Sequence, residues 1–366
     1  MSCPIRTYPF RKPKNHRQPI PRWTLSLPND VGHVYTTYIG VQRHHASGEA
    51  TETSIQAINA IQDWLMRSGY SATSESFVGV ELDDNDVQDV AVWVCYWSDL
   101  VQSKASLQYL SPPNIHADLP ASGRASVGIW QESFATEVSR LETNYSGLDY
   151  LPGLARLPGA STTEHTLSTY WGAARDRIPD SAHDLFRNAA NVERPNPAPR
   201  GIAQHLTGTN HANLVHIRSG QFWENCGQQE ADAYEQKLEP TLRTGLEYLH
   251  ENSVDTGAIG IRYLRSEELP VRFDSRERKE SCGAGFFSNL EDLERWAHTH
   301  QSHLKIYRGA LSHYKAFGDE RRFRTWHEVS IIREGDATFE YVNCAPRTGA
   351  MASLRLEFRA DLDVER

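Results

Sequence analysis

Three histidines, His298, His300 and His303, lie close together towards the end of the chain. An apolar stripe that begins at Leu290 predicts that they lie at the end of a helix. Residues three apart share a helix face, so His300 and His303 could bind one metal ion. A helical zinc site usually has histidines four apart beside a glutamate, and HExxH is absent. The spacing leaves two interpretations open, metal ligands or histidines whose charge stabilises a helix C-terminus.

A fourth histidine, His327, lies in the alternating segment Phe323–Ile331. Such alternation predicts a strand that carries His327 and Val329 on one face and Trp326 on the other. Periodicity does not tell which face points inward. A satisfied structural histidine and a functional one therefore both fit the pattern.

Two further polar groups lie near apolar segments, Arg175-Asp176-Arg177 and Arg218-Ser219. Alone they are weak signals, because charged triplets usually lie on solvated surfaces. The sequence has no GxGxxG, GxxxxGK[ST], GxSxG or CxxCH motif. These absences disfavour nucleotide binding through a glycine-rich loop, an elbow serine hydrolase and covalently attached haem.

The elements that must position these residues occur twice, in the same order. Each half begins with an alternating strand, predicted over His33–Gln42 and again over Asn213–Gly220. An amphipathic helix with apolar residues at helical spacing follows each strand. The apolar positions are Ile55, Ile58, Ile61 and Leu65 in the first half and Tyr234, Leu238, Leu242, Leu246 and Leu249 in the second.

A second strand and a second helix start follow in each half. The pairs are Val90–Trp97 with Ser98-Asp99-Leu100, and Gly283–Phe287 with Ser288-Asn289-Leu290. The Ser-Asx step predicts a helix start, because its side chains can accept hydrogen bonds from free backbone amides. Each half then closes with a strand entered through Trp-x-Glu, at Trp130-Gln131-Glu132 and Trp326-His327-Glu328.

The order β-α-β-β-α-β in each half predicts an α+β fold, in which two ferredoxin-like repeats form a dimeric-type α+β barrel. We expect a Pro-rich basic arm at 1–28, a first half at 29–193, a Pro-rich joint at 194–201 and a second half at 202–366. The arm is expected to be loose, because its prolines exclude helix. An exposed edge of the barrel favours a homodimer.

Composition narrows the class of protein further. The 366 residues include 47 acidic and 38 basic side chains, a net charge of −9, which argues against nucleic acid as a partner. No stretch approaches the roughly 18 apolar residues of a membrane span, and the mean hydropathy is −0.58. Five widely spaced cysteines argue against a disulfide framework. We therefore expect a cytoplasmic protein with no membrane partner.

Several blocks of the sequence resemble, in one order, the aldoxime dehydratases, also called haem-containing dehydratases. The run Phe286–Tyr307 is similar to the haem-ligand region of that family. The other similar blocks are Tyr38–Gln42, Tyr170–Arg177, Ile217–Gln221, Trp326–Ser330 and Phe339–Cys344. The resemblance spans roughly residues 30 to 350 and leaves the N-terminal arm outside.

The resemblance implies haem b, bound non-covalently, with His303 as the axial ligand of its iron. Ser302 stands where the family usually has threonine. The resemblance also implies a set of residues on the other side of the haem, namely Glu142, Arg177, Ser219 and His327. All five positions hold the residue type that the family has there.

The family's reaction converts an aldoxime, R–CH=N–OH, to a nitrile and water, with the substrate nitrogen bound to ferrous haem. The resemblance implies that Ser219 holds the oxime hydroxyl and that His327 protonates the leaving oxygen and then takes the C–H proton. Arg177 is implied to stabilise the developing hydroxide or a haem propionate. Glu142 is implied to orient His327 or keep it protonated, from a position in the closing strand of the first half.

Two other functions share parts of this pattern. A haem peroxidase or monooxygenase on an α+β barrel would share the fold and the axial histidine. A non-catalytic haem carrier or sensor would share the haem site alone. The sequence does not choose between arylaliphatic and alkyl aldoximes as substrates.

Overall fold

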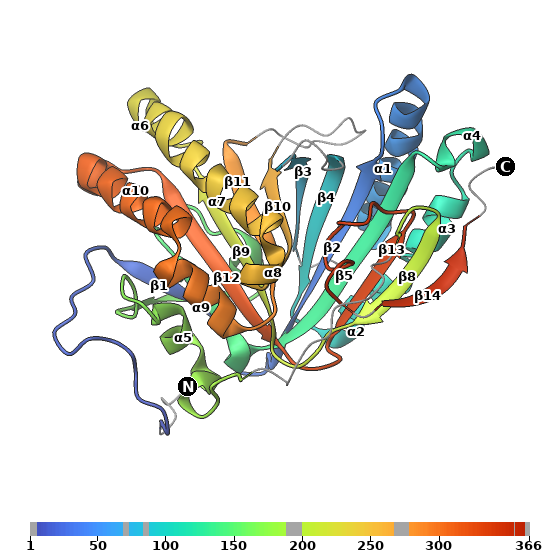
Figure 1. The fold of residues 1–366 in the computed structure, drawn as a ribbon. Helices are drawn as coiled ribbons and strands as arrows, with labels where there is room; N and C mark the ends of the chain where they lie inside the picture. The colour runs from blue at the N-terminus through green and yellow to red at the C-terminus, as the bar shows by residue number, and fades with distance from the viewer. Residues whose placement is uncertain are drawn as a thin grey trace.

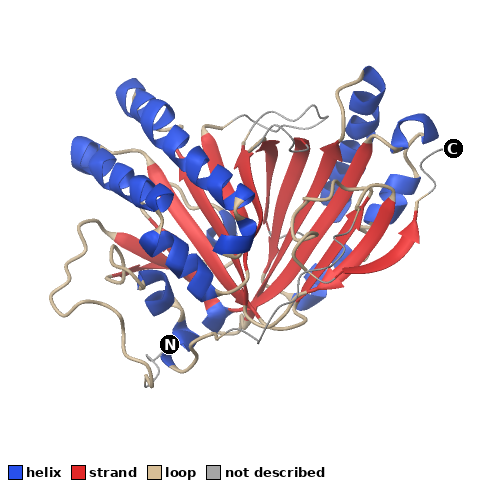
Figure 2. Cartoon of the chain, in the orientation of Figure 1, coloured by secondary structure: helices blue, strands red, loops and turns tan. Residues whose placement is uncertain are grey.

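A computed structural model describes residues 6–68, 73–82, 88–187, 200–266, 278–354 and 356–362. Its strands form one 14-stranded sheet in the order β14-β8-β13-β5-β2-β4-β3-β10-β11-β9-β12-β6-β1-β7. Every pair of neighbouring strands is antiparallel. The strands fan out through the centre of the molecule, and the helices gather at its two sides (Figures 1 and 2). The architecture is α+β.

The first half contains the predicted strands and helices. They are β2 (His33–Arg43), α1 (Gly48–Ser68), β3 (Thr73–Val80), β4 (Gln88–Trp97), α2 (Leu100–Leu107), α3 (Pro112–Ala117), α4 (Ala121–Arg124) and β5 (Val127–Glu137). Asp99 is the N-cap of α2 and accepts a hydrogen bond from the Gln102 amide, which confirms the predicted helix start. The four strands lie in the order β5-β2-β4-β3.

The second half repeats this plan. Its elements are β9 (Leu214–Phe222), α6 (Gln228–Ala233), the π-helical turn η4 (Tyr234–Leu238), α7 (Glu239–Glu251), α8 (Ser253–Thr256), β10 (Ala258–Arg265), β11 (Glu280–Phe287), α9 (Leu290–Thr299), α10 (Gln301–Phe317) and β12 (Arg324–Ile332). Asn289 caps α9 as predicted. The strands lie in the order β10-β11-β9-β12, which mirrors the first half, and the halves join where β3 pairs with β10.

Three strands extend the sheet beyond each half. They are β6 (Leu141–Tyr145), β1 (Arg22–Ser26) and β7 (Ser161–His165) next to β12, and β13 (Ala337–Val342), β8 (Gln204–Thr209) and β14 (Leu356–Asp361) next to β5. The expectation that Glu142 lies in the closing strand of the first half is wrong. The closing strand is β5, whereas Glu142 belongs to β6, which crosses to the second half and pairs with β12. No local pattern encodes such a long-range pairing.

The described part of the N-terminal arm is packed, so the expectation of a loose arm is wrong. Its strand β1 pairs with β7 from Arg22 to Ser26, and Ile20 and Leu27 are buried. The backbone amides of Arg11 and Lys12 donate to the Asp176 carboxylate. Prolines exclude helix but still allow an extended chain to pair at a sheet edge. The predicted joint at 194–201 lies mostly outside the described residues.

The Trp-x-Glu motif has the same surroundings in both halves. Each tryptophan packs over a glycine of the neighbouring strand and under an arginine, in the triplets Gly40–Trp130–Arg262 and Gly220–Trp326–Arg218. A Cβ added to Gly40 would lie 2.3 Å from the Trp130 ring, and one added to Gly220 would lie 2.2 Å from Trp326. Only glycine fits such close approaches.

A buried charge cluster surrounds Arg218, on the face of the sheet where Arg218 packs against Trp326. The Arg218 Nη1 donates to Glu75 at 2.7 Å and to the Tyr96 hydroxyl at 2.6 Å. That hydroxyl donates to Glu328 at 3.0 Å, and Glu328 also accepts from the Leu154 amide at 2.8 Å. Burial, opposed in part by Arg218, raises the pKa of Glu328 to about 7.

Replacing Glu328 by glutamine should change how stability depends on pH. The folded protein raises the pKa of Glu328 from 4.5 to about 7, so its contribution to stability is complete below pH 4.5 and is lost as pH rises through 7. This shift corresponds to on the order of 3 kcal/mol. In urea unfolding, the free energy of unfolding of Glu328→Gln relative to that of wild type should therefore be higher at about pH 8 than at about pH 5. Glu291→Gln, at an exposed position, is the control. An equal difference between Glu328→Gln and wild type at both pH values would contradict the raised pKa.

Among the described helices, none is long and apolar enough to cross a membrane.

Candidate active site

A cavity of about 590 Å³ lies in the second half, between the outer face of the sheet and the helices. Strands β6, β9 and β12 form one wall, and α7, α9 and α10 contribute the side chains that face it. The segment that leads into α5 (Ala173–Arg177) lines the cavity as well, together with Arg11 and Arg22 from the N-terminal arm. The lining is mainly apolar with a few polar groups, which is typical of cofactor and ligand sites.

Three polar residues form a row across the strand wall. His327 on β12 is in register with Ser219 on β9 and with Asn144 on β6. All three line the cavity, as do Thr325 and Val329. Trp326 and Glu328 are buried on the opposite face of β12. The predicted alternation is confirmed, and the packing of Trp326 decides which face His327 occupies.

His327 contacts a buried ion pair that the sequence separates widely. Its Nε2 lies 2.8 Å from the Glu142 Oε1 and 3.0 Å from the Arg177 Nη2. Arg177 donates to the same Glu142 oxygen and to the Leu167 carbonyl. Burial alone would raise the pKa of Glu142, but Arg177 and His327 outweigh it and hold that pKa below its usual range. Glu142 is therefore a carboxylate, and the Nε2–H of His327 donates to it.

Of these three side chains, His327 is the most accessible. Its side chain is 28% exposed, against 5% for Arg177 and 0% for Glu142. Only the imidazole can therefore exchange a proton with a molecule in the cavity. Ser219, on the adjacent strand, places its hydroxyl beside it.

The histidine cluster spans a junction between two helices, so its expected place at the end of one helix holds for His298 and His300 but is wrong for His303. Helix α9 ends at Thr299, and α10 begins at Gln301. His300 is the N-cap of α10, accepts from the Ser302 amide and stacks on Tyr248 at 3.8 Å. The break between the helices removes the shared face expected for His300 and His303. The change of direction falls at His300 without a glycine or proline to signal it.

His298 and His303 both line the cavity from the helix side, but they differ in burial. His303 packs next to Trp296, whose ring lies 4.8 Å away, whereas His298 is exposed. The Nδ1 of His303 is buried and has no hydrogen-bond partner among the residues that the structure describes. Burial lowers the pKa of His303 to about 4, so the ring is neutral near pH 7. Neutral imidazole is the form that binds metal.

Comparison with known proteins decides the family. The model of the haem-containing dehydratase family matches residues 37–350. The chain belongs to the haem-containing dehydratases.

Relatives in this family match nearly the whole chain. An aliphatic aldoxime dehydratase from Pseudomonas chlororaphis is 29% identical, and the match covers 96% of each protein. A phenylacetaldoxime dehydratase from Bacillus sp. (strain OxB-1) is 27% identical over 92% of each. A crystal structure of an aldoxime dehydratase in complex with butyraldoxime superposes with a TM-score of 0.81 at 25% identity, covering 96% of this chain and 94% of that one.

Haem is the cofactor of this family, and the residues of the cavity fit it. The walls are mainly apolar, as a porphyrin requires, and His303 offers a neutral imidazole with a buried nitrogen that lacks a protein partner. The strand wall presents polar groups that can contact a second molecule. A neutral histidine on the helix side of the cavity therefore faces polar groups on the strand wall.

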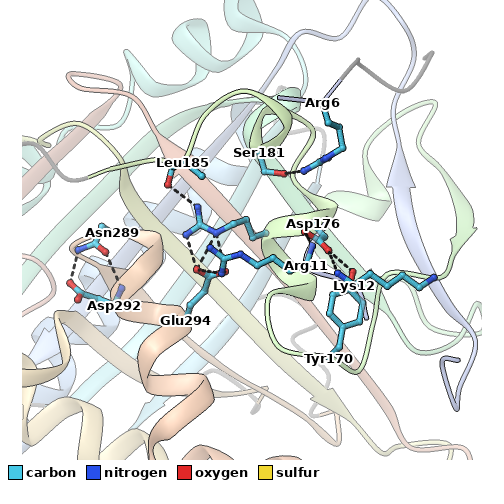
Figure 3. A network of polar contacts seen from close by, with 11 residues as sticks. Arg6, Arg11, Lys12, Tyr170, Asp176, Ser181, Leu185, Asn289, Asp292 and Glu294 are labelled. Atoms are coloured by element: carbon cyan, nitrogen blue, oxygen red, sulfur yellow. Dashed lines mark hydrogen bonds and ion pairs between the residues drawn. The ribbon is translucent and has the colours of Figure 1, made fainter. Parts of the chain in front are cut away.

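Some lining residues were not predicted from the sequence. Asn144 extends the row of His327 and Ser219, and Trp171 packs 4.9 Å from His298 and 6.2 Å from His303. Alternation within β6 could have indicated Asn144, two residues after Glu142. Arg11 donates to Glu294 on α9 (Figure 3), and Arg175 donates to the same carboxylate. No sequence signal ties the arm to α9.

Proposed function

We propose that this protein dehydrates aldoximes, R–CH=N–OH, to nitriles and water, and that it is a lyase using non-covalently bound haem b. One observation carries the proposal: Ser219 and His327 line the strand wall of the cavity that His303 also lines from α10, and His327 contacts the buried Glu142–Arg177 pair. The relatives named for aliphatic and phenylacetaldoximes and the structure with butyraldoxime support this substrate class.

His303 would hold the haem, and the bound haem would supply an electron-rich Fe(II) that binds the oxime nitrogen and weakens the N–O bond. Ser219 donates a hydrogen bond to the oxime oxygen and orients it towards His327. His327 gives that oxygen a proton, so water leaves instead of hydroxide. The neutral imidazole then takes the proton from the substrate carbon, which completes the nitrile and restores His327.

The buried Glu142–Arg177 pair positions His327 for both proton transfers. Glu142 accepts from the Nε2–H of His327 at 2.8 Å and so fixes the orientation of the ring. Arg177 balances the charge of the buried carboxylate. Since the proton that leaves with water is replaced from the C–H bond, the cycle needs no external acid, base or reductant.

Ser219→Ala should weaken aldoxime binding and slow turnover while haem stays bound. The lost hydrogen bond to a partly charged oxygen is worth roughly 1.5 to 3 kcal/mol, or about one to two decades in kcat/KM. Thr325→Val is the control, because it removes another hydroxyl from the same wall. Steady-state kinetics with haem occupancy measured by absorbance would check this. Unchanged kcat/KM, or loss of haem, would remove Ser219 from the proposed role.

The proposed function is tested by supplying the reduced, haem-loaded protein with butyraldoxime or phenylacetaldoxime and measuring nitrile by gas chromatography. Nitrile from the holoprotein and none from the haem-free protein is expected. A protein that acts only with peroxide or oxygen would instead be a peroxidase or monooxygenase. Reversible spectral changes without product would indicate a carrier or sensor.

We propose in addition that the two halves, at about 29–193 and 202–366, are ferredoxin-like repeats of one α+β barrel. The mirrored strand orders β5-β2-β4-β3 and β10-β11-β9-β12 support this. Glu142 and Arg177 would then be contributions of the first half to the site in the second. A homodimer and a cytoplasmic location stay predictions from the sequence.

A further inference from the structure

Arg22 brings to the cavity a guanidinium that forms no ion pair with a carboxylate among the described residues. It is the first residue of β1 and lines the cavity. Its Nη1 is buried and has no hydrogen-bond partner in the described part of the chain. The other two arginines that line the cavity each contact a carboxylate, Arg11 that of Glu294 and Arg177 that of Glu142.

The charged groups around Arg22 raise the free-energy cost of placing its guanidinium there. Burial, together with the nearby cations Arg321 and Arg177, lowers the pKa of Arg22 to about 10. A buried charge without a counter-charge is strongly unfavourable, and like charges add to the cost. A guanidinium is retained in such a place when a ligand brings the missing anion, since its fork matches a carboxylate in two hydrogen bonds.

The two molecules proposed to occupy this cavity, the aldoxime and the haem, differ in charge. An aldoxime is neutral, whereas haem carries two propionate carboxylates. We propose that Arg22 pairs with a propionate of the haem and that strand β1 thereby forms part of the cofactor site. The inference uses only the haem cofactor of the family and does not depend on which reaction the haem supports.

The fold holds Arg22 in place for this role. β1 lies between β6 and β7, and Arg22 is in register with His165 on β7. Ile20 and Leu27 anchor the two ends of the strand in the core. The strand precedes residues 37–350, which the family model matches. The N-terminal segment therefore adds an element to the site that the matched region does not contain.

The test is the rate at which the holoprotein releases haem to excess apomyoglobin, with no aldoxime present. Arg22→Met should release haem about 10- to 100-fold faster than wild type, because a buried, bidentate ion pair is lost. Arg17→Met is the matched control, because Arg17 is an exposed arginine of the same segment. It should release haem at the wild-type rate.

Haem dimethyl ester, which has no free carboxylate, makes the test specific. Wild type and Arg22→Met should release the ester at equal rates, because the partner of Arg22 is then absent from both. Arg22→Lys keeps the charge without the fork and should lie between wild type and Arg22→Met for ordinary haem. If circular dichroism shows that Arg22→Met is unfolded, the release of haem and of its ester is compared between wild type and Arg22→Lys instead.

Two results would overturn the proposal. One is wild-type release of ordinary haem from Arg22→Met. The other is equal acceleration for haem and for its ester, which would mean that Arg22 acts on the fold alone. A change confined to the KM of an aldoxime bearing a terminal carboxylate would instead assign Arg22 to substrate binding. Because no aldoxime is used in the release assay, failure here leaves the proposed dehydration untouched.

Discussion

His327→Ala should keep haem bound at wild-type occupancy and lower turnover of an aldoxime by 10²- to 10⁴-fold, the usual effect of removing a general acid–base group. The reason is that the imidazole is the one accessible member of the buried His327–Glu142–Arg177 group. Without it, the leaving oxygen has no proton donor and the substrate carbon no base. The measurement is kcat with haem occupancy from the absorbance of the Soret band.

A second histidine–glutamate pair provides the control for this variant. The Nε2 of His205 lies 2.8 Å from Glu340, the same separation as in the His327–Glu142 pair, but His205 is on β8, far along the sheet. His205→Ala should therefore leave turnover unchanged. Loss of haem from His327→Ala would indicate a ligand role. An unchanged rate would remove His327 from the mechanism.

His303→Ala should abolish stoichiometric haem binding, because this variant lacks the proposed ligand of the iron. Turnover should fall with the haem content. The haem-to-protein ratio and the spectrum of the reduced protein would measure this. Adding imidazole to His303→Gly should restore haem and part of the spectrum, since the small molecule can occupy the space that the side chain leaves.

The neighbouring histidines serve as controls for the ligand. His298→Ala removes an exposed side chain and should retain haem. His300→Ala removes the N-cap of α10 and should lower stability by about 1 kcal/mol while retaining haem. If His303→Ala keeps full haem and a wild-type reduced spectrum while His300→Ala loses both, the ligand is His300.

Much of the framework is encoded in local patterns. Strand patterns in the sequence predict β2, β4, β9 and β12, and Ser-Asx steps predict the starts of α2 and α9. These features depend only on near neighbours in the chain. The face of β12 that His327 occupies depends instead on a contact with another strand, because Trp326 packs over Gly220 of β9.

The rest of the site arises from contacts between distant segments. Glu142 reaches His327 because β6 pairs with β12, a pairing that brings together two residues 185 positions apart in the chain. Arg22 reaches the cavity because β1 inserts between β6 and β7. Antiparallel pairing of this kind is decided by the assembled sheet edge, so no window of sequence contains it. The resemblance to a family identified Glu142 and Arg177, but only the fold brings them to His327.

The most direct test of the central claim is anaerobic turnover. The haem-loaded protein is reduced once, freed of reductant, and given excess aldoxime under nitrogen. Because dehydration is redox-neutral, many nitriles should form for each haem without added reductant, peroxide or oxygen, and the ferric protein should form few or none. Equal rates from ferric and ferrous protein, or one equivalent of reductant consumed for each nitrile, would contradict haem-dependent aldoxime dehydration.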